Sequence, residues 1–99
     1  MMKISYENKE LIRHIQDICL RINQYTDYVA FYHFSGHVNG FDIRVCKSKE
    51  DYNNRIYAKE LYMNLFEDDE LYNELSEILE TLQGYENGSK EVQVSETSI

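Results

Sequence analysis

The residue types that most often carry chemistry are concentrated in one short stretch of this chain, between positions 33 and 46. The members of this group are His33, His37, Asp42, Arg44 and Cys46. An imidazole held by a carboxylate can transfer protons, and a thiolate beside an imidazole can act as a nucleophile or bind Zn²⁺. The stretch is therefore the first place to test for a catalytic or metal site.

Neither kind of site is complete in this group. A structural zinc site takes four ligands, and this group supplies three at most. A nucleophilic Cys needs surroundings that stabilise its thiolate and donors that bind an oxyanion, and no glycine-rich turn stands beside Cys46. We interpret the group as the solvated outer face of a strand pair. A metal-dependent activity on this face is the weakest of three hypotheses.

The acidic run from Glu67 through Asp68 and Asp69 to Glu70 is a second group that could bind a metal. It lacks the alternate ligand spacing and central Gly of a Ca²⁺-binding EF-hand loop. We interpret it as the capped, acid-rich start of a helix. Phosphate-binding glycine loops, dinucleotide fingerprints and nucleophile elbows do not occur in the sequence. We therefore predict a protein that is not an enzyme and that uses no cofactor or metal.

The clearest element is an amphipathic helix over residues 6–25. Apolar residues recur there at three- and four-residue steps, and Ser5 stands where an N-cap belongs. A β-hairpin follows, because two β-rich runs over residues 28–35 and 41–46 flank Asn39-Gly40. Asn-Gly is typical of a two-residue type I′ turn, in which both positions need a positive φ.

That turn sets the register of the hairpin and sorts its side chains onto two faces. The register pairs Val38 with Phe41, His37 with Asp42, Ser35 with Arg44, and His33 with Cys46. The face expected to meet the helices carries Tyr28, Ala30, Tyr32, Phe34, Val38, Phe41, Ile43 and Val45. A slip by one residue would exchange the two faces, so the apolar pattern supports the assignment of faces.

The chain after the hairpin predicts two more helices. One covers roughly residues 49–66, but its periodicity is blurred, and a short third strand over residues 55–59 is the alternative. The other covers Glu70 to Gln83, and Gly84 is placed to end it as a C′ glycine.

The fold class that follows is α+β. We expect a small antiparallel hairpin or sheet, covered on one face by an N-terminal helix and two C-terminal helices. Residues 1–84 form a single domain, and residues 85–99 form a flexible acidic and polar tail.

Charge is distributed unevenly along the chain, whose net charge is -8. Residues 1–59 hold nine Lys or Arg and seven Asp or Glu, a balance of +2, whereas residues 60–99 hold eleven acids and one base, a balance of -10. Such a field repels nucleic acids and anionic membranes and favours a basic protein partner. No apolar run approaches the ~18 residues that span a bilayer. With two thiols outside any C-x-x-C pair, we expect a cytoplasmic protein.

The predicted partner-binding surface lies on the last helix. Glutamates there fall opposite the leucines, and residues 60–89 contain no Lys or Arg to pair with them. Tyr is also enriched at binding surfaces, and two or three of the nine tyrosines are expected to contribute. The predicted surface comprises Glu67, Asp68, Asp69, Glu70, Tyr72, Glu74 and Glu77.

The hairpin segment over residues 34–45, from Phe34 to Val45, resembles a segment of short uncharacterised proteins of Gram-positive phages and prophages. The short acidic α+β layout with a Glu- and Asp-rich helical end is similar in style to some anti-CRISPR inhibitors of type II Cas nucleases. That resemblance implies a DNA mimic, in which carboxylates take the place of phosphates at the DNA-recognition site of the nuclease.

Two function hypotheses from different classes come before the metal-dependent one. The first is a phage-type inhibitor that blocks a basic, nucleic-acid-binding host protein. The second is a non-enzymatic structural or assembly accessory that forms homo-oligomers through its hairpin.

Overall fold

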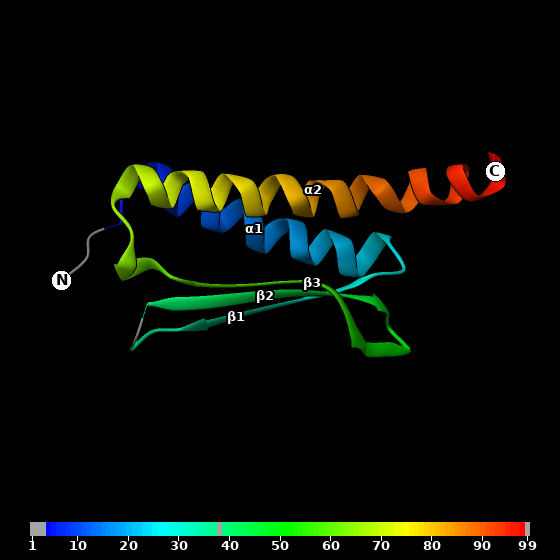
Figure 1. Ribbon diagram of the computed structural model, residues 1–99, viewed down its shortest axis with the longest axis horizontal. Coiled ribbons are helices and arrows are strands. Elements are labelled where there is room, and N and C mark those ends of the chain that lie inside the picture. Colours follow the sequence, from blue (N-terminus) through cyan, green and yellow to red (C-terminus); the bar gives the residue numbers. More distant parts are fainter. Residues whose placement is uncertain (1–3, 38, 99) are drawn as a thin grey trace.

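The computed structural model describes the backbone of residues 4–37 and 39–98 and the side chains of residues 4–37, 39–51 and 53–87. The fold is α+β, with the elements in the order α1 (Tyr6–Tyr25), β1 (Val29–Ser35), β2 (Gly40–Ser48), β3 (Asp51–Tyr62), the 3₁₀ turn η1 (Met63–Leu65) and α2 (Asp68–Ser98). The strands form one antiparallel sheet in the order β1-β2-β3. Both helices lie on one face of this sheet (Figure 1). No helix in the described ranges is long and apolar enough to cross a membrane.

Helix α1 has the bounds that the sequence predicts. The Oγ of Ser5 accepts a hydrogen bond from the N–H of Asn8 at 3.2 Å, which confirms the N-cap. Its apolar side is buried in the core together with residues of the sheet and of α2. The buried core consists of Ile15, Ile18, Cys19, Ile22, Ala30, Phe41, Ile43, Val45, Leu61, Met63, Leu71, Leu75, Ile78 and Leu82.

The register predicted for the hairpin is wrong. Phe41 pairs with Phe34, and Asp42 pairs with His33, so the chain reverses over a longer turn than Asn39-Gly40 alone. Asn39 has the positive φ of 49° that a turn residue needs, but no described glycine has a positive φ, and Gly40 already belongs to β2. Val38, which was predicted to pair with Phe41, lies outside the described residues.

A close approach from the third strand explains why a glycine stands at position 40. A Cβ built on Gly40 would lie 2.9 Å from Cδ1 of Tyr62, the residue that pairs with Gly40 across the β2–β3 ladder. Glycine therefore lets the Tyr62 ring pack over the backbone at this point. The pair Asn39-Gly40 indicated a turn, but its second residue, Gly40, is part of strand β2 and pairs with Tyr62 of β3.

The predicted faces of the hairpin are nevertheless correct at the central positions. Ala30, Phe41, Ile43 and Val45 are buried beneath the helices, because the observed register differs from the predicted one by an even number of residues. The prediction for Cys46 is wrong, since its side chain is only 1% exposed instead of solvated. The β2–β3 register shifts on both sides of Cys46, which marks a bulge in the ladder.

The segment predicted as a helix over residues 49–66 is mostly strand. The third strand, which was the alternative for residues 55–59, is confirmed and extends over the whole of β3, Asp51–Tyr62. Along it, Tyr57, Lys59 and Leu61 pair with the inward-facing residues of β2. Pairing with the free edge of β2 overrides the weak local helical pattern, since the preference for strand depends on the neighbours that a segment meets.

The C-terminal part holds one helix instead of two, because the segment before it is strand. Helix α2 begins at Asp68 and continues through Gly84 to Ser98, so the prediction of an end at Gln83 is wrong. Tyr85 packs on the core, with its ring centroid 5.4 Å from that of Tyr28, and thereby favours continuation of the helix past the glycine. Tyr85 and Glu86 thus belong to the packed part of α2. The predicted tail, residues 85–99, therefore begins with two packed residues. That the rest of this tail is flexible stays a prediction.

Candidate functional site

The acidic run at the start of α2 caps the helix. The N–H of Glu67 donates to Oε1 of Glu70 at 2.9 Å, and the N–H of Leu71 donates to the carbonyl oxygen of Glu67 at 2.8 Å. Glu67 is therefore the N-cap residue, and Glu70 supplies the side-chain half of a capping box from the third helical position, while its own N–H donates to Oδ1 of Asp69 at 3.0 Å. The helix dipole also favours the carboxylates of Asp68 and Asp69 in this first turn. The predicted capping is confirmed, with the helix beginning two residues earlier than expected.

A buried side chain of α1 holds the start of α2 in place. Asn8 is fully buried, and its Nδ2 donates to the carbonyl oxygen of Asp68 at 3.0 Å and to Oδ1 of Asp68 at 2.8 Å. The backbone and one carboxylate oxygen of Asp68 therefore have a structural role. The acidic turn is fixed to α1 across 60 residues of sequence, which makes its carboxylates a preorganised group.

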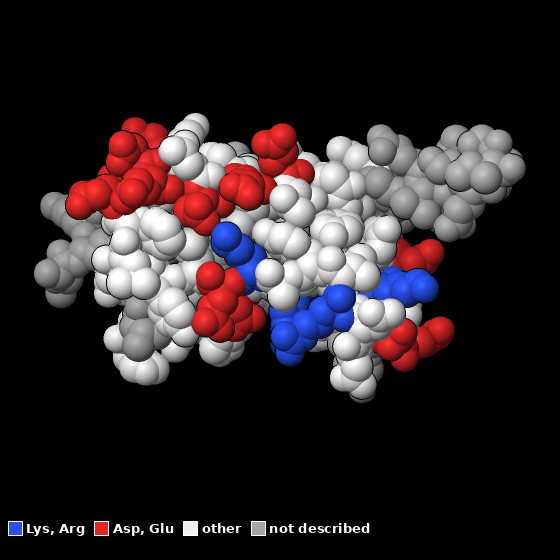
Figure 2. Space-filling view, in the orientation of Figure 1, with Lys and Arg blue, Asp and Glu red and all other residues white. Residues whose placement is uncertain are grey.

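The acidic face of α2 is presented to solvent. Leu71, Leu75 and Ile78 are at most 1% exposed, so the residues on the opposite side of the helix must point outward. Between residues 67 and 80, the exposed residues are Glu67, Asp68, Asp69, Glu70, Tyr72, Asn73, Glu77 and Glu80. Figure 2 shows their consequence, since red atoms gather over the first half of α2 and the blue atoms lie below it. Six of the seven residues predicted for the partner surface thus lie together on one exposed surface.

Glu74 is the exception among the predicted residues. Its Oε1 lies 3.0 Å from Nζ of Lys59, and its side chain is 30% exposed. Within the described part of the chain, Lys59 is the one base in an ion pair with residues 67–80. Glu74 therefore faces β3 and links the helix to the sheet. Such a partly exposed ion pair contributes little to stability. It does mean that the carboxylate of Glu74 is already bound to a base and is less available to a partner protein.

Glu77 borders the same side of the helix. Burial raises the pKa of Tyr57 above its usual range, and the negative charge of Glu77 raises it further. Glu77 thus lies close enough to β3 to act on a tyrosine of that strand while its own side chain remains exposed. The first three turns of α2 consequently present carboxylates both outward and along the β3 side.

An apolar side chain adjoins the acidic face, and sequence reasoning missed it. Leu65 in η1 is 77% exposed and stands two residues before Glu67. The predicted helix over residues 49–66 placed Leu65 on its apolar side, so nothing in the local pattern indicated an exposed position. Tyr72 is 47% exposed on the acidic face itself. Exposed apolar and aromatic groups beside charges are typical of binding surfaces.

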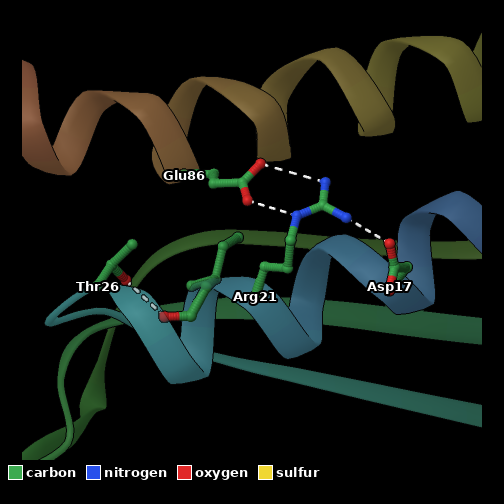
Figure 3. A network of polar contacts seen from close by, with 5 residues as sticks. Asp17, Arg21, Thr26 and Glu86 are labelled. Atoms are coloured by element: carbon green, nitrogen blue, oxygen red, sulfur yellow. Dashed lines mark hydrogen bonds and ion pairs between the residues drawn. The ribbon is translucent and has the colours of Figure 1, made fainter.

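The other end of the described helix is tied to α1 by a polar network. Arg21 lies between Asp17 of its own helix and Glu86 of α2 (Figure 3). Its Nε is 2.5 Å from Oε2 of Glu86, and a second nitrogen donates to Oε1 at 3.3 Å. The hydrogen bond with Glu86 raises the pKa of Arg21 and is the largest cause of that shift. Glu86 is therefore neutralised by a base, unlike the outward-facing carboxylates of the first turns.

The His, Asp, Arg and Cys residues on the sheet are not paired as the sequence predicted. His33 lies opposite Asp42, with Nδ1 and Oδ2 3.8 Å apart, and not opposite Cys46. His37 lies in the turn instead of opposite Asp42. No group of three or more His, Cys, Asp or Glu residues could hold a metal ion in the ranges that the structure describes.

His33, Asp42 and Arg44 of this group border an open hollow on the uncovered face of the sheet. Arg44 lies over the ring of Phe31, with its guanidinium carbon 4.8 Å from the centroid, and its Nε is 4.0 Å from Oδ1 of Asp42. The hollow has a volume of about 510 Å³ and mixes acids with bases. It is lined by His33, Asp42, Ile43, Arg44, Arg55, Ala58, Lys59 and Glu60. Its charges largely compensate one another, which sets it apart from the single-sign surface of α2.

The acidic face of α2 is therefore the candidate functional site. Comparison with protein-family models, with curated proteins and with solved structures finds no match to this chain. The chemistry available at this surface is recognition by charge, supported by the apolar groups of Leu65 and Tyr72 at its border.

Proposed function

We propose that this protein acts by binding, and that the acidic face of α2 occupies the nucleic-acid-binding surface of a basic host protein. In this proposal it is a phage- or prophage-type inhibitor, and a type II Cas nuclease is a suitable target. The observation that carries the proposal is the row of exposed carboxylates on α2, which one described base, Lys59, touches from the side of the sheet.

The charge balance supports a partner with a strong positive potential. The part of the chain from residue 60 onward carries -10, against +2 before it. Charges concentrated at one end of a small body attract an oppositely charged surface from a distance and orient it before contact. Among the described residues, the ion pairs of α2 are those of Glu74 and Glu86, which lie on the sides facing the sheet and α1 and not on the outward face.

The geometry of a helix suits the imitation of a phosphate backbone. Each residue rises about 1.5 Å along a helix axis, so Glu70 and Glu77 are about 10.5 Å apart along it, which is close to three phosphate intervals of about 3.4 Å on one DNA strand. Glu70 and Glu77 are two turns apart, and Asp69 extends the row at the capped end. Because the capping box and Asn8 hold this end rigidly, little side-chain or backbone freedom is lost when a partner binds.

In this proposal, the contact residues are chosen by the exposure of their side chains and by the ion pairs that they make. Glu67, Asp68, Asp69, Glu70, Glu77 and Tyr72 are assigned to the partner surface. Glu74 is assigned a supporting role, because its carboxylate is bound by Lys59. Reversal of Glu74 would also place two cations side by side, so it is unsuitable as a test of binding.

The test is a double charge reversal at exposed positions, Asp69→Lys with Glu77→Lys; because Oδ1 of Asp69 accepts a hydrogen bond from the N–H of Glu70 at 3.0 Å, unfolding curves verify that the variant folds. A matched control, Asp27→Lys with Glu50→Lys, makes the same change in net charge at exposed positions away from α2. DNA binding and DNA cleavage by purified type II Cas nucleases are measured with each protein added. We expect the parent and the control to inhibit, and the α2 double variant to lose at least about tenfold in potency.

Two results would contradict the proposal. One is equal inhibition by the α2 double variant and the control. The other is the absence of any effect of the parent both on these nucleases and on other basic nucleic-acid-binding proteins that it retains from a Gram-positive lysate at low salt.

A further inference from the structure

The two outer edges of the sheet differ in how they are protected. At the β1 edge, Asn23 of α1 acts as a neighbouring strand would. Its Nδ2 donates to the carbonyl oxygen of Ala30 at 2.9 Å, and its Oδ1 accepts from the N–H of Ala30 at 2.7 Å. One side chain thus satisfies both backbone groups at this position and blocks the edge to another strand.

The same two bonds determine which residues of β3 face outward. Since Ala30 bonds to Asn23, its pair with Val45 is one of the non-hydrogen-bonded pairs of the β1–β2 ladder. Such pairs alternate along an antiparallel ladder. Val45 and the other odd-numbered residues of β2 therefore bond to β3, where they pair with Tyr57, Lys59 and Leu61.

Ala58, Glu60 and Tyr62 consequently direct their backbone N–H and C=O groups away from the sheet. Among the described residues, none makes a hydrogen bond to these groups on that side except at the carbonyl oxygen of Tyr62, which accepts the first bond of η1 as its N-cap residue. The edge is closed only further along, where the hydroxyl of Tyr85 donates to the carbonyl oxygen of Ile56 at 3.3 Å. Both backbone groups of Ala58 and of Glu60 and the N–H of Tyr62 therefore remain open at the outer edge of β3, which is a template for one more strand.

Helix α2 places its acids beside this open edge. Glu74 reaches Lys59 on the helix-facing side of β3, and Glu77 lies close to Tyr57. On the opposite side, Glu60 adds an exposed carboxylate of the strand itself. Since Lys59 is already paired with Glu74, a segment that pairs with β3 would meet the carboxylate of Glu77 near its helix-facing side, and on the other side Glu60 together with the base Arg55. Lys or Arg placed next to Glu60 and Glu77 would complement these two carboxylates.

We propose that the open edge of β3 receives an extended, basic segment of the partner as a fourth strand. This inference deepens the proposed function and rests on it, because the acidic face of α2 and the β3 edge would contact the same basic protein. A second copy of this chain is a poorer occupant. Antiparallel pairing of two β3 edges would place the acidic α2 helices of the two copies on the same side of the joined sheet. Their like charges would then repel one another.

The experiment uses a defined probe, the peptide acetyl-Lys-Val-Lys-Val-Lys-Val-amide, added to the full chain. Its control is the same sequence with every backbone nitrogen methylated, which keeps the charges, removes the N–H donors of the peptide and places methyl groups where the two strands would meet. Binding is followed by titration calorimetry, and backbone amide exchange is followed by NMR. We expect the methylated peptide to bind at least about tenfold more weakly. We also expect the unmethylated peptide to slow exchange at Ala58, Glu60 and Tyr62.

A pair of variants provides an independent comparison. Ala58→Pro removes one outward N–H and no ladder bond, a substitution that an edge strand tolerates. Ala58→Thr keeps the N–H. We expect Pro at this position to weaken peptide binding about tenfold and Thr to leave it unchanged, with unfolding curves used to verify that both variants fold.

Equal binding of the two peptides would overturn strand addition while leaving charge recognition by α2 intact. Absence of binding by either peptide would overturn it as well. A dimer in sedimentation that Ala58→Pro dissociates would assign the edge to a second copy instead. The proposed function fails separately, through the reversal of Asp69 and Glu77, so the two ideas can be distinguished.

Discussion

At the scale of single residues, Gly40 shows how a sheet can require a glycine that resembles a turn signal. Its backbone is not in the left-handed region, yet a side chain at this position would meet the ring of Tyr62 at 2.9 Å. The glycine is needed for space and not for backbone freedom.

The corresponding prediction is that Gly40→Ala destabilises the protein by about 1–3 kcal/mol, because the ring of Tyr62 must move to admit the methyl group. Urea denaturation measures this change. Gly36→Ala is the matched control, since its Cβ would lie 3.7 Å from the nearest atom and should cost much less. Equal effects of the two substitutions would show that the contact with Tyr62 is not the cause.

The thiol of Cys19 carries a second prediction at this scale. Burial raises the pKa of Cys19 from its ordinary 9.0 to about 11. The neutral thiol therefore persists in the folded state at pH 9, and alkylation by iodoacetamide should be slow until the protein unfolds. Because the unfolded chain ionises first, the contribution of this group to stability is full below pH 9 and is lost as the pH rises through 11. Rapid labelling of Cys19 in the folded protein at pH 9, followed by mass spectrometry, would contradict this.

At the scale of elements, the backbone conformation of Gly84 determines whether α2 ends there or continues. The structure continues the helix through Gly84, where an added Cβ would meet nothing within 4 Å. Gly84→Ala should then stabilise the protein by about 0.5–1 kcal/mol, because Ala is the better helix former. A C′ glycine in the left-handed region would give the opposite sign, since Ala is strained there. The unfolding free energy of the variant distinguishes the two.

The capping box at the start of α2 gives another prediction at this scale. Glu70→Ala removes the acceptor for the N–H of Glu67 and should cost about 0.5–1 kcal/mol. Glu70→Gln keeps an acceptor at the same position and should retain most of the stability while losing the charge. Thermal unfolding of the two variants separates the cap from the charge. A larger loss for Gln than for Ala would be inconsistent with a capping role.

At the scale of the whole molecule, concentration of negative charge on one helix is expected to strain the fold at low salt. The net charge is -8, and exposed acids of the first turns of α2 lie close together. Added sodium chloride shortens the distance over which exposed charges act on one another, from about 10 Å at 0.1 M to about 3 Å at 1 M, and so weakens the repulsion between these acids. The melting temperature of the parent should therefore rise with salt.

Reversal of Asp69 and Glu77 to Lys should flatten this dependence, whereas the control reversal of Asp27 and Glu50 should flatten it less. Calorimetric melting over a salt series measures both. Equal slopes for the two double variants would show that total charge, and not its position on α2, sets the response.

Local signals in the sequence were sufficient for the elements whose partners are near in the chain. The cap at Ser5, the apolar spacing of α1 and the acid cap of α2 depend on residues three or four positions apart. The faces of the hairpin were also predictable, because alternation survives any shift of register by an even number. The helical spacing of three and four residues likewise predicted that the acids of α2 lie on its exposed side, opposite its buried leucines.

Only the tertiary structure decided the features that depend on distant partners. The segment of β3 forms a strand because it pairs with the edge of β2. In the same ladder, the ring of Tyr62 leaves no space for a side chain at position 40, so a glycine stands there. Lys59 withdraws Glu74 from the acidic surface, and Tyr85 favours continuation of α2 past Gly84. Spacing along the chain does not contain such contacts, because each joins segments whose relative position is set by packing of the whole core.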